Sequence, residues 1–283
     1  MYKLLATDMD GTLLCSRKVV TRANAAAIRS AVRRGVQFVI CTGRSYHSAR
    51  IFGWLMGVRP YIVAANGASG HAPDGRVLFQ SPMPDPVAAA AIRILRRYGV
   101  AFQMYTPGGV VIEGDRPRRE RIRWSTLGDP AVATTRLLSR LANQHIAVPD
   151  AIAHLTQGGP ALKFFCPVAE PDRRAQALAD LADARLPLTV SSSGRDNFEL
   201  NAEGVHKARG LERLTTLLGV DRADVIAVGD HLNDLEMLQW AGLGVAMANG
   251  VPEAKAATRA VTASNDEDGV AQLIRRYILD EAG

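Results

Sequence analysis

Residues 3–13 read KLLATDMDGTL, a short apolar run that ends in two carboxylates, Asp8 and Asp10. An apolar run of this length bounded by turn residues predicts a buried strand, here over residues 3–7. Gly11 then allows the chain to turn sharply. Taken alone, this pair of acids fits a simple Asp-Gly turn as well as an active-site loop. An EF-hand calcium loop is excluded, because glycine stands at the fourth position instead of the sixth and no glutamate closes the loop.

The same rhythm of apolar strand and amphipathic helix continues on both sides of a central region. Strands are expected at residues 37–41, 61–65, 224–229 and 243–247, and helices at residues 21–34, 45–56, 206–218, 234–240 and 269–280. Strands that alternate with helices predict a parallel sheet with crossover connections. We therefore predict an α/β fold for both ends of the chain.

The middle of the chain has a different pattern. Residues 81–86 read SPMPDP, and so many prolines indicate a linker. Beyond it, strand-like pieces at 101–105, 110–113, 161–166 and 188–192 accompany helices at 87–98 and 171–182. This mixture predicts an α+β domain. We expect one core formed by residues 1–82 and 191–283, with a second domain inserted at residues 83–190.

Composition excludes several classes of protein. A hydrophobic fraction of 47% and a charged fraction of 22% are typical of a soluble globular chain. No apolar run approaches the roughly 18 residues of a membrane helix, and the apolar stretch at residues 4–6 is too short for a signal peptide. The three cysteines, Cys15, Cys41 and Cys166, form neither a disulfide framework nor a zinc pattern. We expect a cytoplasmic protein with reduced thiols.

Charge gives a weaker indication of the ligand. The net charge is +6, and the densest basic cluster consists of Arg116, Arg118, Arg119, Arg121 and Arg123. Such a cluster would attract anionic substrates, but a solvated helix face in an arginine-rich protein is the preferred interpretation. Without interleaved aromatic residues or a zinc finger, the sequence does not predict a nucleic-acid partner.

Polar residues follow four of the predicted core strands. Asp8, Thr42, Asn66 and Asp230 each stand where an apolar strand ends. Ligands of open parallel sheets bind outside the carboxyl ends of the strands, so these side chains are expected around one crevice. Carboxylates such as Asp8 and Asp230 are the oxygen ligands that Mg²⁺ prefers. A helix N-terminus is a second interpretation of residues 230–234, because Asp and Asn are favoured there.

Four motifs together resemble those of the haloacid dehalogenase superfamily. They are DMDGTL at residues 8–13, TGR at 42–44, Lys207, and GDHLND at 229–234. Their order and spacing, and the NGA at residues 66–68, are similar to the Cof-type branch, which has a large α/β cap inserted after the third core strand. The resemblance covers the whole chain. It implies a Rossmann-like parallel-sheet core with a mobile, inserted α+β cap, and a magnesium-dependent phosphatase.

The resemblance also implies catalytic and metal-binding roles. Asp8 matches the nucleophile, which forms a phospho-aspartyl intermediate. Asp10 matches the general acid and base. The expected Mg²⁺ ligands are the Asp8 carboxylate, the Asp10 backbone carbonyl and Asp230, with Asp234 beside them to hold a metal-bound water or the loop.

Phosphoryl contacts are implied for Thr42, Gly43, Lys207 and Asn233. A hydroxyl and an ammonium suit this task, because phosphoryl transfer gains mostly from positioning and charge stabilisation. One departure from the family pattern follows Lys207: residues 208–211 read ARGL where the family usually has Gly-x-Ala-Leu. The start of this helix is therefore expected to differ slightly. Lys163 is set aside because it falls in the inserted domain.

The presence of Asp10 favours cleavage of phosphate esters or anhydrides over dehalogenation. The expected substrates are small phosphorylated metabolites, such as sugar phosphates or related phosphomonoesters. Arg195, Asn66 and His231 are weaker candidates for contacts with the leaving group. A phosphomutase of the same superfamily and a catalytically silent sugar-phosphate-binding regulator remain alternatives, and the oligomeric state stays open.

Overall fold

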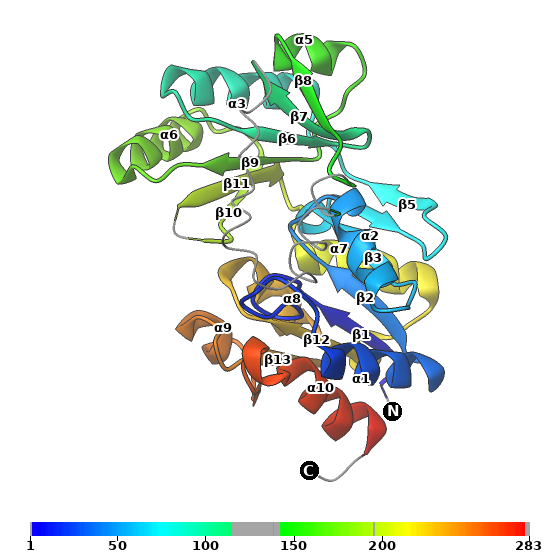
Figure 1. Ribbon diagram of the computed structural model, residues 1–283. Coiled ribbons are helices and arrows are strands. Elements are labelled where there is room, and N and C mark those ends of the chain that lie inside the picture. Colours follow the sequence, from blue (N-terminus) through cyan, green and yellow to red (C-terminus); the bar gives the residue numbers. More distant parts are fainter. Residues whose placement is uncertain (1, 115–137, 139–141, 195, 281–283) are drawn as a thin grey trace, which may run out of the picture.

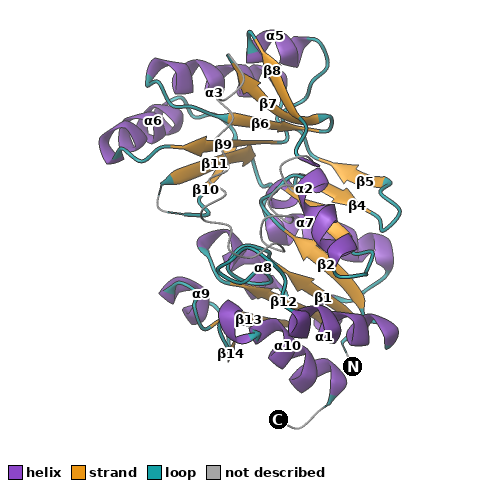
Figure 2. Ribbon diagram, viewed as in Figure 1, coloured by secondary structure: helices purple, strands orange, loops and turns teal. Residues whose placement is uncertain are grey.

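Two β-sheets, each packed against its own helices, make up this computed structural model, which describes residues 2–114, 138, 142–194 and 196–280 (Figures 1 and 2). Both ends of the chain form the lower sheet of Figure 1, and the middle of the chain forms the upper one. The elements of the lower part are β1 (Leu4–Thr7), α1 (Arg22–Arg33), β2 (Gln37–Cys41), α2 (Tyr46–Leu55), β3 (Tyr61–Ala64), β4 (Ser69–His71), β5 (Val77–Gln80), α7 (Lys207–Leu218), β12 (Val225–Gly229), α8 (Leu235–Trp240), β13 (Leu243–Met247), α9 (Pro252–Ala256), β14 (Ala260–Thr262) and α10 (Gly269–Ile274). Those of the upper part are α3 (Asp85–Arg97), β6 (Gln103–Thr106), β7 (Gly109–Glu113), β8 (His145–Val148), α5 (Ala151–Thr156), β9 (Lys163–Pro167), α6 (Pro171–Asp183), β10 (Leu188–Ser191) and β11 (Asn197–Ala202).

The core sheet joins the two ends of the chain at its centre. Its strand order is β14-β13-β12-β1-β2-β3-β4-β5, and the strands from β14 to β3 run parallel. Leu4 of β1 pairs with Gln37 of β2 on one side and with Val225 of β12 on the other. The predicted parallel α/β core is confirmed, and the sequence-distant β1 and β12 are direct neighbours in it.

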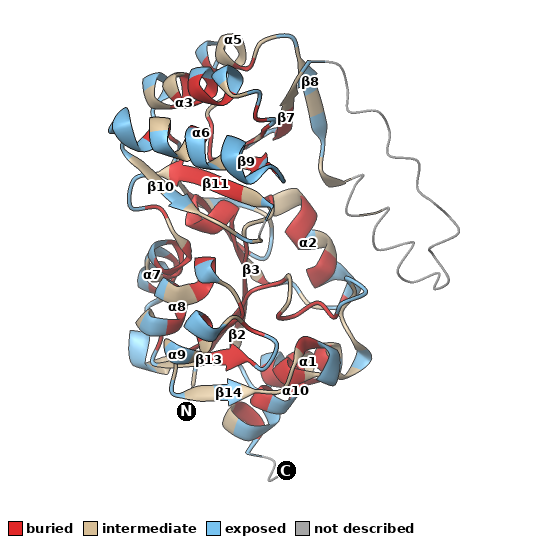
Figure 3. Ribbon diagram, turned by 90° about the vertical axis from the view of Figure 1, so that its left-hand side faces the viewer, coloured by how far each residue is buried: buried red, intermediate tan, exposed pale blue. Residues whose placement is uncertain are grey.

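Alternating side chains bury both faces of the core sheet. Leu5 of β1 shares a hydrophobic cluster with Ile28 of α1 and Ile274 of α10. The next residue toward the N-terminus, Leu4, shares a different cluster with Leu211 of α7. Successive strand residues point to opposite faces, so the sheet needs helices on both sides. The result is three layers, with buried strands between helices whose outer faces are exposed (Figure 3).

The cap has two layers. Its sheet, in the order β10-β11-β9-β6-β7-β8, packs one face against α3, α5 and α6. Phe164 and Phe198 belong to the hydrophobic cluster on that face. Their neighbours Lys163 and Glu199 therefore lie on the opposite face of the sheet, which is turned toward the core.

The cap sheet extends further along the chain than the predicted boundary. The sequence analysis ended the inserted domain at residue 190, within β10. However, β10 pairs with β11, which in turn pairs with β9. Because β10 lies at the edge of the sheet, a division at residue 190 separates two hydrogen-bonded strands. By strand pairing, the cap sheet continues to Ala202 and the chain returns to the core just before α7.

Three further features bear on the sequence analysis. Among the described residues, no helix is long and apolar enough to cross a membrane. The three cysteines are free and buried. The arginine cluster at residues 116–123 and Arg195 lie outside the described residues.

Candidate active site

Four predicted site residues meet at the carboxyl edge of the core sheet. Asp8 follows β1, Thr42 follows β2 and Asp230 follows β12, whereas Asn66 lies in a 3-10 turn after β3. Because β12, β1, β2 and β3 are successive strands of one parallel sheet, their ends lie at the same edge. The crevice thus forms where the topological rule places it.

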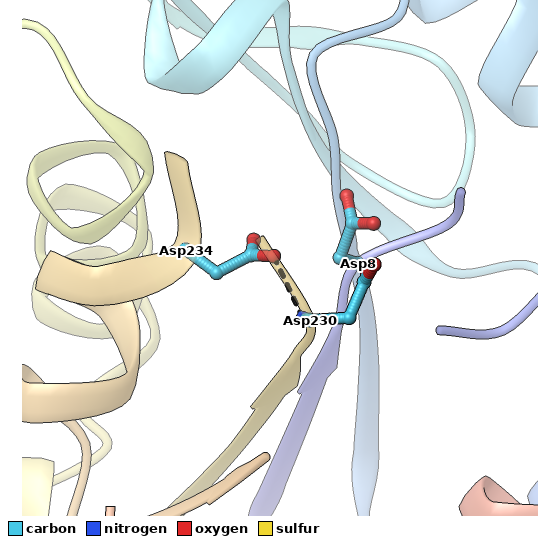
Figure 4. A group of neighbouring side chains, drawn as sticks. All are labelled: Asp8, Asp230 and Asp234. Carbon is cyan, nitrogen blue, oxygen red and sulfur yellow. Dashed lines mark hydrogen bonds between the residues drawn. The ribbon is translucent and has the colours of Figure 1, made fainter. Parts of the chain in front are cut away.

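Three carboxylates come together at this edge (Figure 4). One oxygen each of Asp8, Asp230 and Asp234 lies within 4.8 Å of the others, and all three residues are buried. The Oδ2 of Asp234 accepts hydrogen bonds from the backbone amides of Asp230 and His231, both at 3.0 Å. Asp234 therefore holds the loop after β12 in place, one of the two roles expected for it.

Lys207 places an ammonium between two of these acids. It is the first residue of α7, and its Nζ lies 2.6 Å from Oδ1 of Asp8 and 2.6 Å from Oδ1 of Asp234. Burial alone lowers the pKa of an ammonium, but the charges of Asp234 and Asp8 outweigh it and hold the pKa of Lys207 well above its ordinary value. The ammonium is therefore a permanent positive charge beside Asp8.

The departure from the family pattern after Lys207 has a structural counterpart. Helix α7 begins at Lys207 itself, and Gly210 packs against the turn after β3. A Cβ at Gly210 would lie 2.6 Å from the Cα of Gly67. The close approach of the two backbones explains why a glycine stands at this position of the helix.

Burial and mutual repulsion perturb the clustered acids. Burial, together with the charges of Asp234 and Asp230, raises the pKa of Asp8 to about 8 although Lys207 opposes the shift. Burial also raises the pKa of Asp230 to about 6, with a further contribution from Asp234. When carboxyl groups lie this close together, their protonated forms are favoured unless a bound cation neutralises the negative charge.

Residues 11 and 12 fix the position of Asp230. The hydroxyl of Thr12 donates a hydrogen bond of 2.7 Å to Oδ1 of Asp230. Gly11 has a φ of +88°, and a Cβ there would lie 2.2 Å from Oδ2 of Asp230. Gly11 is thus required both for its backbone conformation and for the space that the carboxylate occupies.

Asp10 has basic partners instead of a place in the three-acid cluster. Its carboxylate accepts hydrogen bonds from Nε and Nη2 of Arg44, at 2.6 and 2.7 Å, and from Nζ of Lys18 at 3.0 Å. Burial favours the neutral acid, but Arg44 and Lys18 outweigh it and hold the pKa of Asp10 well below its ordinary range. In this arrangement Asp10 is a charged base, and its carboxylate is not part of the three-acid cluster.

The residues expected to contact phosphate surround the same crevice. Thr42 is buried, and its Oγ1 accepts a hydrogen bond of 3.2 Å from the amide of Arg44. Asn233, in the turn that follows β12, is also buried. Its Nδ2 lies 3.5 Å from Oδ1 of Asn66. The loops after β2, β3 and β12 therefore converge with Lys207 around the end of β1.

Comparison with known proteins identifies the family. The family described as haloacid dehalogenase-like hydrolase matches residues 5–274. This chain belongs to the haloacid dehalogenase-like hydrolases. Phosphatase YwpJ of Bacillus subtilis (strain 168) is 30% identical over 292 residues, covering 98% of this chain and 100% of that protein. The 5-amino-6-(5-phospho-D-ribitylamino)uracil phosphatase YwtE of the same organism is 30% identical over 283 residues, covering 98% of each chain.

Solved structures of haloacid dehalogenase-like hydrolases share the complete fold. The structure of such a hydrolase from B. subtilis has a TM-score of 0.83 at 27% identity, covering 98% of this chain and 100% of that chain. A HAD subclass IIB sugar phosphatase has a TM-score of 0.76 at 19% identity, covering 97% and 98%. The fold predicted from the resemblance, a Rossmann-like core with a cap, is therefore confirmed.

The chemistry of the three-acid cluster fits the Mg²⁺ that is typical of haloacid dehalogenase-like hydrolases. The cluster offers only oxygen ligands, in a buried site where their repulsion favours a divalent cation. Each of the three acids offers one oxygen to the cluster, and Asp234 also accepts two backbone hydrogen bonds through Oδ2.

The cap contributes to the crevice of this hydrolase. A cleft of about 290 Å³ lies between cap and core, lined among others by Ser191, Ser192, Lys207 and Asn233. The Nδ1 of His231 lies 3.2 Å from the carbonyl oxygen of Ser192. His231 is thus placed at the contact between cap and core, near the expected leaving-group side.

Sequence reasoning gave no role to three residues that the structure brings to this edge. Arg44 was quoted as part of a motif, and its salt bridge with Asp10 was not foreseen. Lys163 was set aside because it lies in the cap, although its Nζ is 2.7 Å from the carbonyl oxygen of Gly43. Glu199, the partner of Lys163, lies on a strand that the sequence analysis did not predict. The alternation in residues 197–202, NFELNA, was the available signal for that strand.

Proposed function

We propose that this chain is a magnesium-dependent phosphatase that hydrolyses small phosphomonoesters through a phospho-aspartyl intermediate on Asp8. The observation that carries the proposal is the placement of the Asp8 carboxylate next to Lys207 and the other acids of the cluster. A nucleophile flanked by a permanent cation and a divalent-cation site can approach an anionic phosphoryl group without prohibitive repulsion.

In the first displacement, an oxygen of Asp8 attacks phosphorus and the bond from phosphorus to the leaving oxygen breaks. Asp10 gives its proton to that oxygen. A bound Mg²⁺ would be held by Asp8 and Asp230 and would neutralise charge on the phosphoryl oxygens. Thr42, Gly43, Lys207 and Asn233 would orient the group.

In the second displacement, Asp10 takes a proton from water and the resulting hydroxide attacks the acyl phosphate, which releases inorganic phosphate and restores Asp8. The charged Asp10 held by Arg44 suits this base step directly. For the first step Asp10 has to leave Arg44 and carry a proton, because a charged carboxylate has none to donate. Rotation of Asp10 away from Arg44 is therefore part of the proposed cycle.

Substrates of this chain are expected among small phosphorylated metabolites. The relatives include phosphatases named for an aminouracil phosphate and for HMP-PP. Ser191 and Ser192 of the cap line a cleft together with Lys207 and Asn233, so the cap is placed to contact the leaving group.

The test is release of inorganic phosphate from a panel of phosphorylated metabolites, with Mg²⁺ and with a chelator. We expect turnover that requires Mg²⁺ and that Asp8→Asn reduces by at least about 10³-fold, because no other carboxylate can replace the nucleophile. Asp224→Asn is a matched control, since Asp224 forms a surface ion pair with Lys3. An Asp8→Asn variant that keeps most of its turnover would contradict the proposal. Isomerised sugar phosphate without phosphate release would instead support the phosphomutase alternative.

A further inference from the structure

A buried ion pair in the cap has no part in the chemistry described so far. Lys163 of β9 and Glu199 of β11 lie 2.8 Å apart, and their side chains are only 1% and 2% exposed. Taking two charges out of water is unfavourable unless further hydrogen bonds satisfy them. The partners of this pair therefore indicate what it holds in place.

The partners lie in the core, on the two loops that border the phosphoryl site. Lys163 Nζ donates a hydrogen bond of 2.7 Å to the carbonyl oxygen of Gly43, on the loop after β2. Oε2 of Glu199 accepts a hydrogen bond of 2.6 Å from Nδ2 of Asn66, in the turn after β3. One ion pair of the cap thus contacts both loops.

The turn after β3 needs such support. Ala65 and Asn66 have φ values of +51° and +56°, a region that residues other than glycine rarely adopt. Asn66 contacts Glu199 of the cap, as described above. In addition, Asn201 of the cap donates hydrogen bonds to the carbonyl oxygens of Ala65, at 2.9 Å, and Leu162, at 3.0 Å. The cap therefore holds the turn in a conformation that is unfavourable by itself.

The loop after β2 is enclosed just as tightly. A Cβ added to Gly43 would lie 2.9 Å from Nζ of Lys163 and 2.9 Å from Oδ1 of Asn66. Both side chains therefore occupy the space beside Gly43 that a larger residue would need. A shift of the ammonium or of Asn66 would leave the Gly43 backbone without its neighbours on that side.

We propose that Lys163 and Glu199 form a cap-borne positioning pair that gives Gly43 and Asn66 the geometry needed to bind a phosphoryl group. The pair reaches these residues only when the cap rests on the core, so cap closure and assembly of the phosphoryl pocket are one event. This inference rests on the proposed function, because it takes Thr42 and Gly43 as the phosphoryl-binding loop. Lys163 and Glu199 act through that loop and do not contact the reacting atoms.

The experiment compares Lys163→Met, Glu199→Gln and the double variant with the parent chain. Lys3→Met is the matched control, because Lys3 forms an ion pair of 2.6 Å with Asp224 but is 62% exposed. Three quantities are measured: the Kd of inorganic phosphate by calorimetry with Mg²⁺, kcat and KM for p-nitrophenyl phosphate, and Tm. Inorganic phosphate occupies only the phosphoryl pocket, so its Kd reports the geometry of that pocket.

We expect each single variant to raise the phosphate Kd and KM by about 10-fold, a size typical of residues that orient a binding shell. The double variant should resemble the single variants, since the pair acts as a unit, and Lys3→Met should match the parent. A lower Tm with an unchanged phosphate Kd would show a purely structural role and overturn the proposal. An unchanged phosphate Kd with a substrate-dependent change in KM would also overturn it, because Lys163 would then contact the leaving group.

The near-isosteric Glu199→Gln variant decides the outcome if Lys163→Met does not fold. Failure of the proposed function is a separate result, namely a parent chain that binds phosphate with Mg²⁺ but releases none from any ester. The calorimetric measurement tests the positioning pair in that situation too.

Discussion

A carboxylate and an ammonium, both removed from water, define the site at the scale of single residues. Asp8 and Lys207 are 2.6 Å apart at the end of the central strand, and Asp230 and Asp234 lie beside them. The charges of this cluster do not balance, since three acids face one lysine. The missing positive charge is what a divalent cation supplies, so stability and metal binding should depend on each other.

Without a divalent cation, stability is expected to fall as pH rises from about 6.5 to about 8. Burial raises the pKa of Asp8 in the folded chain to about 8 from an ordinary value of 3.8. The folded state therefore binds more protons than the unfolded state in this window, so the free energy of unfolding decreases with pH. His71, whose burial lowers its pKa to about 4 from an ordinary value of 6.5, has its main effect on stability between these two values and thus below the window.

Urea unfolding in chelator at the two ends of this window measures the effect. Asp8→Asn should flatten the pH dependence, and Mg²⁺ should stabilise the parent chain more at the higher pH, where it competes with fewer protons. Stability that stays level or increases across the window in chelator would contradict the assignment of Asp8.

At the scale of elements, two core helices start with the same kind of N-cap, and one of them borders the site. The hydroxyl of Thr21 accepts a hydrogen bond of 3.1 Å from the amide of Asn24 at the start of α1. Ser45 does the same for α2, accepting one of 3.2 Å from the amide of Ser48. Because α2 begins directly after Arg44, the N-cap residue Ser45 also fixes where the loop of residues 42–44 ends. The two N-caps are alike in chemistry, but only that of α2 directly follows the loop of residues 42–44.

Removal of either N-cap hydroxyl should lower stability, but only removal of the one at α2 should also change substrate binding. Thr21→Ala and Ser45→Ala are each expected to lower the free energy of unfolding by about 1 kcal/mol, because helix amides lose their acceptor. Only Ser45→Ala should also raise KM, since the loop of residues 42–44 loses its anchor. Urea unfolding and steady-state kinetics on both variants provide the comparison, with Thr21→Ala as the control for an N-cap that does not adjoin the loop of residues 42–44. Equal KM values in the two variants would show that the cap of α2 does not influence the loop.

At the scale of the whole molecule, the cap and the core close one crevice between them. Their contacts include a hydrogen bond of 2.5 Å from the hydroxyl of Ser45 to Oδ1 of Asn143 and the contact of His231 with Ser192. A buried crevice of this kind has to open for substrate to enter and for phosphate to leave. Turnover should therefore fall when opening of the cap is blocked.

A disulfide between the cap and the core tests this expectation. Ser45→Cys combined with Asn143→Cys places two thiols where the parent side chains touch, and the native cysteines are buried and should not interfere. We expect the oxidised protein to lose most of its phosphate release and to regain it on reduction. The reduced form and each single variant are the controls. Equal turnover in the oxidised and reduced forms would mean that cap opening is not part of the cycle.

The helices and strands that carry the motifs were predictable because their signals are local. Apolar runs of four or five residues marked β1, β2, β3 and β12, and polar residues at their ends indicated the crevice. Seven short elements were missed, namely the strands β4, β5, β8, β11 and β14 and the helices α5 and α9. They are too short to stand out in the sequence, and the strands are held in place by their pairing partners. The boundary of the cap was misplaced for the same reason.

The alternating α/β pattern, the four motifs and the acids at the end of β1 could be predicted from the amino-acid sequence. These features depend on residue type and on spacing along a few neighbouring positions. Two other contacts appear only in the folded chain: Arg44 holds Asp10, and Lys163 hydrogen-bonds Gly43 from a position 120 residues away. Such contacts depend on which face of a strand turns toward another domain. Local periodicity predicts that successive side chains of a strand point to opposite faces of the sheet. The packing of whole sheets determines which residues those side chains contact.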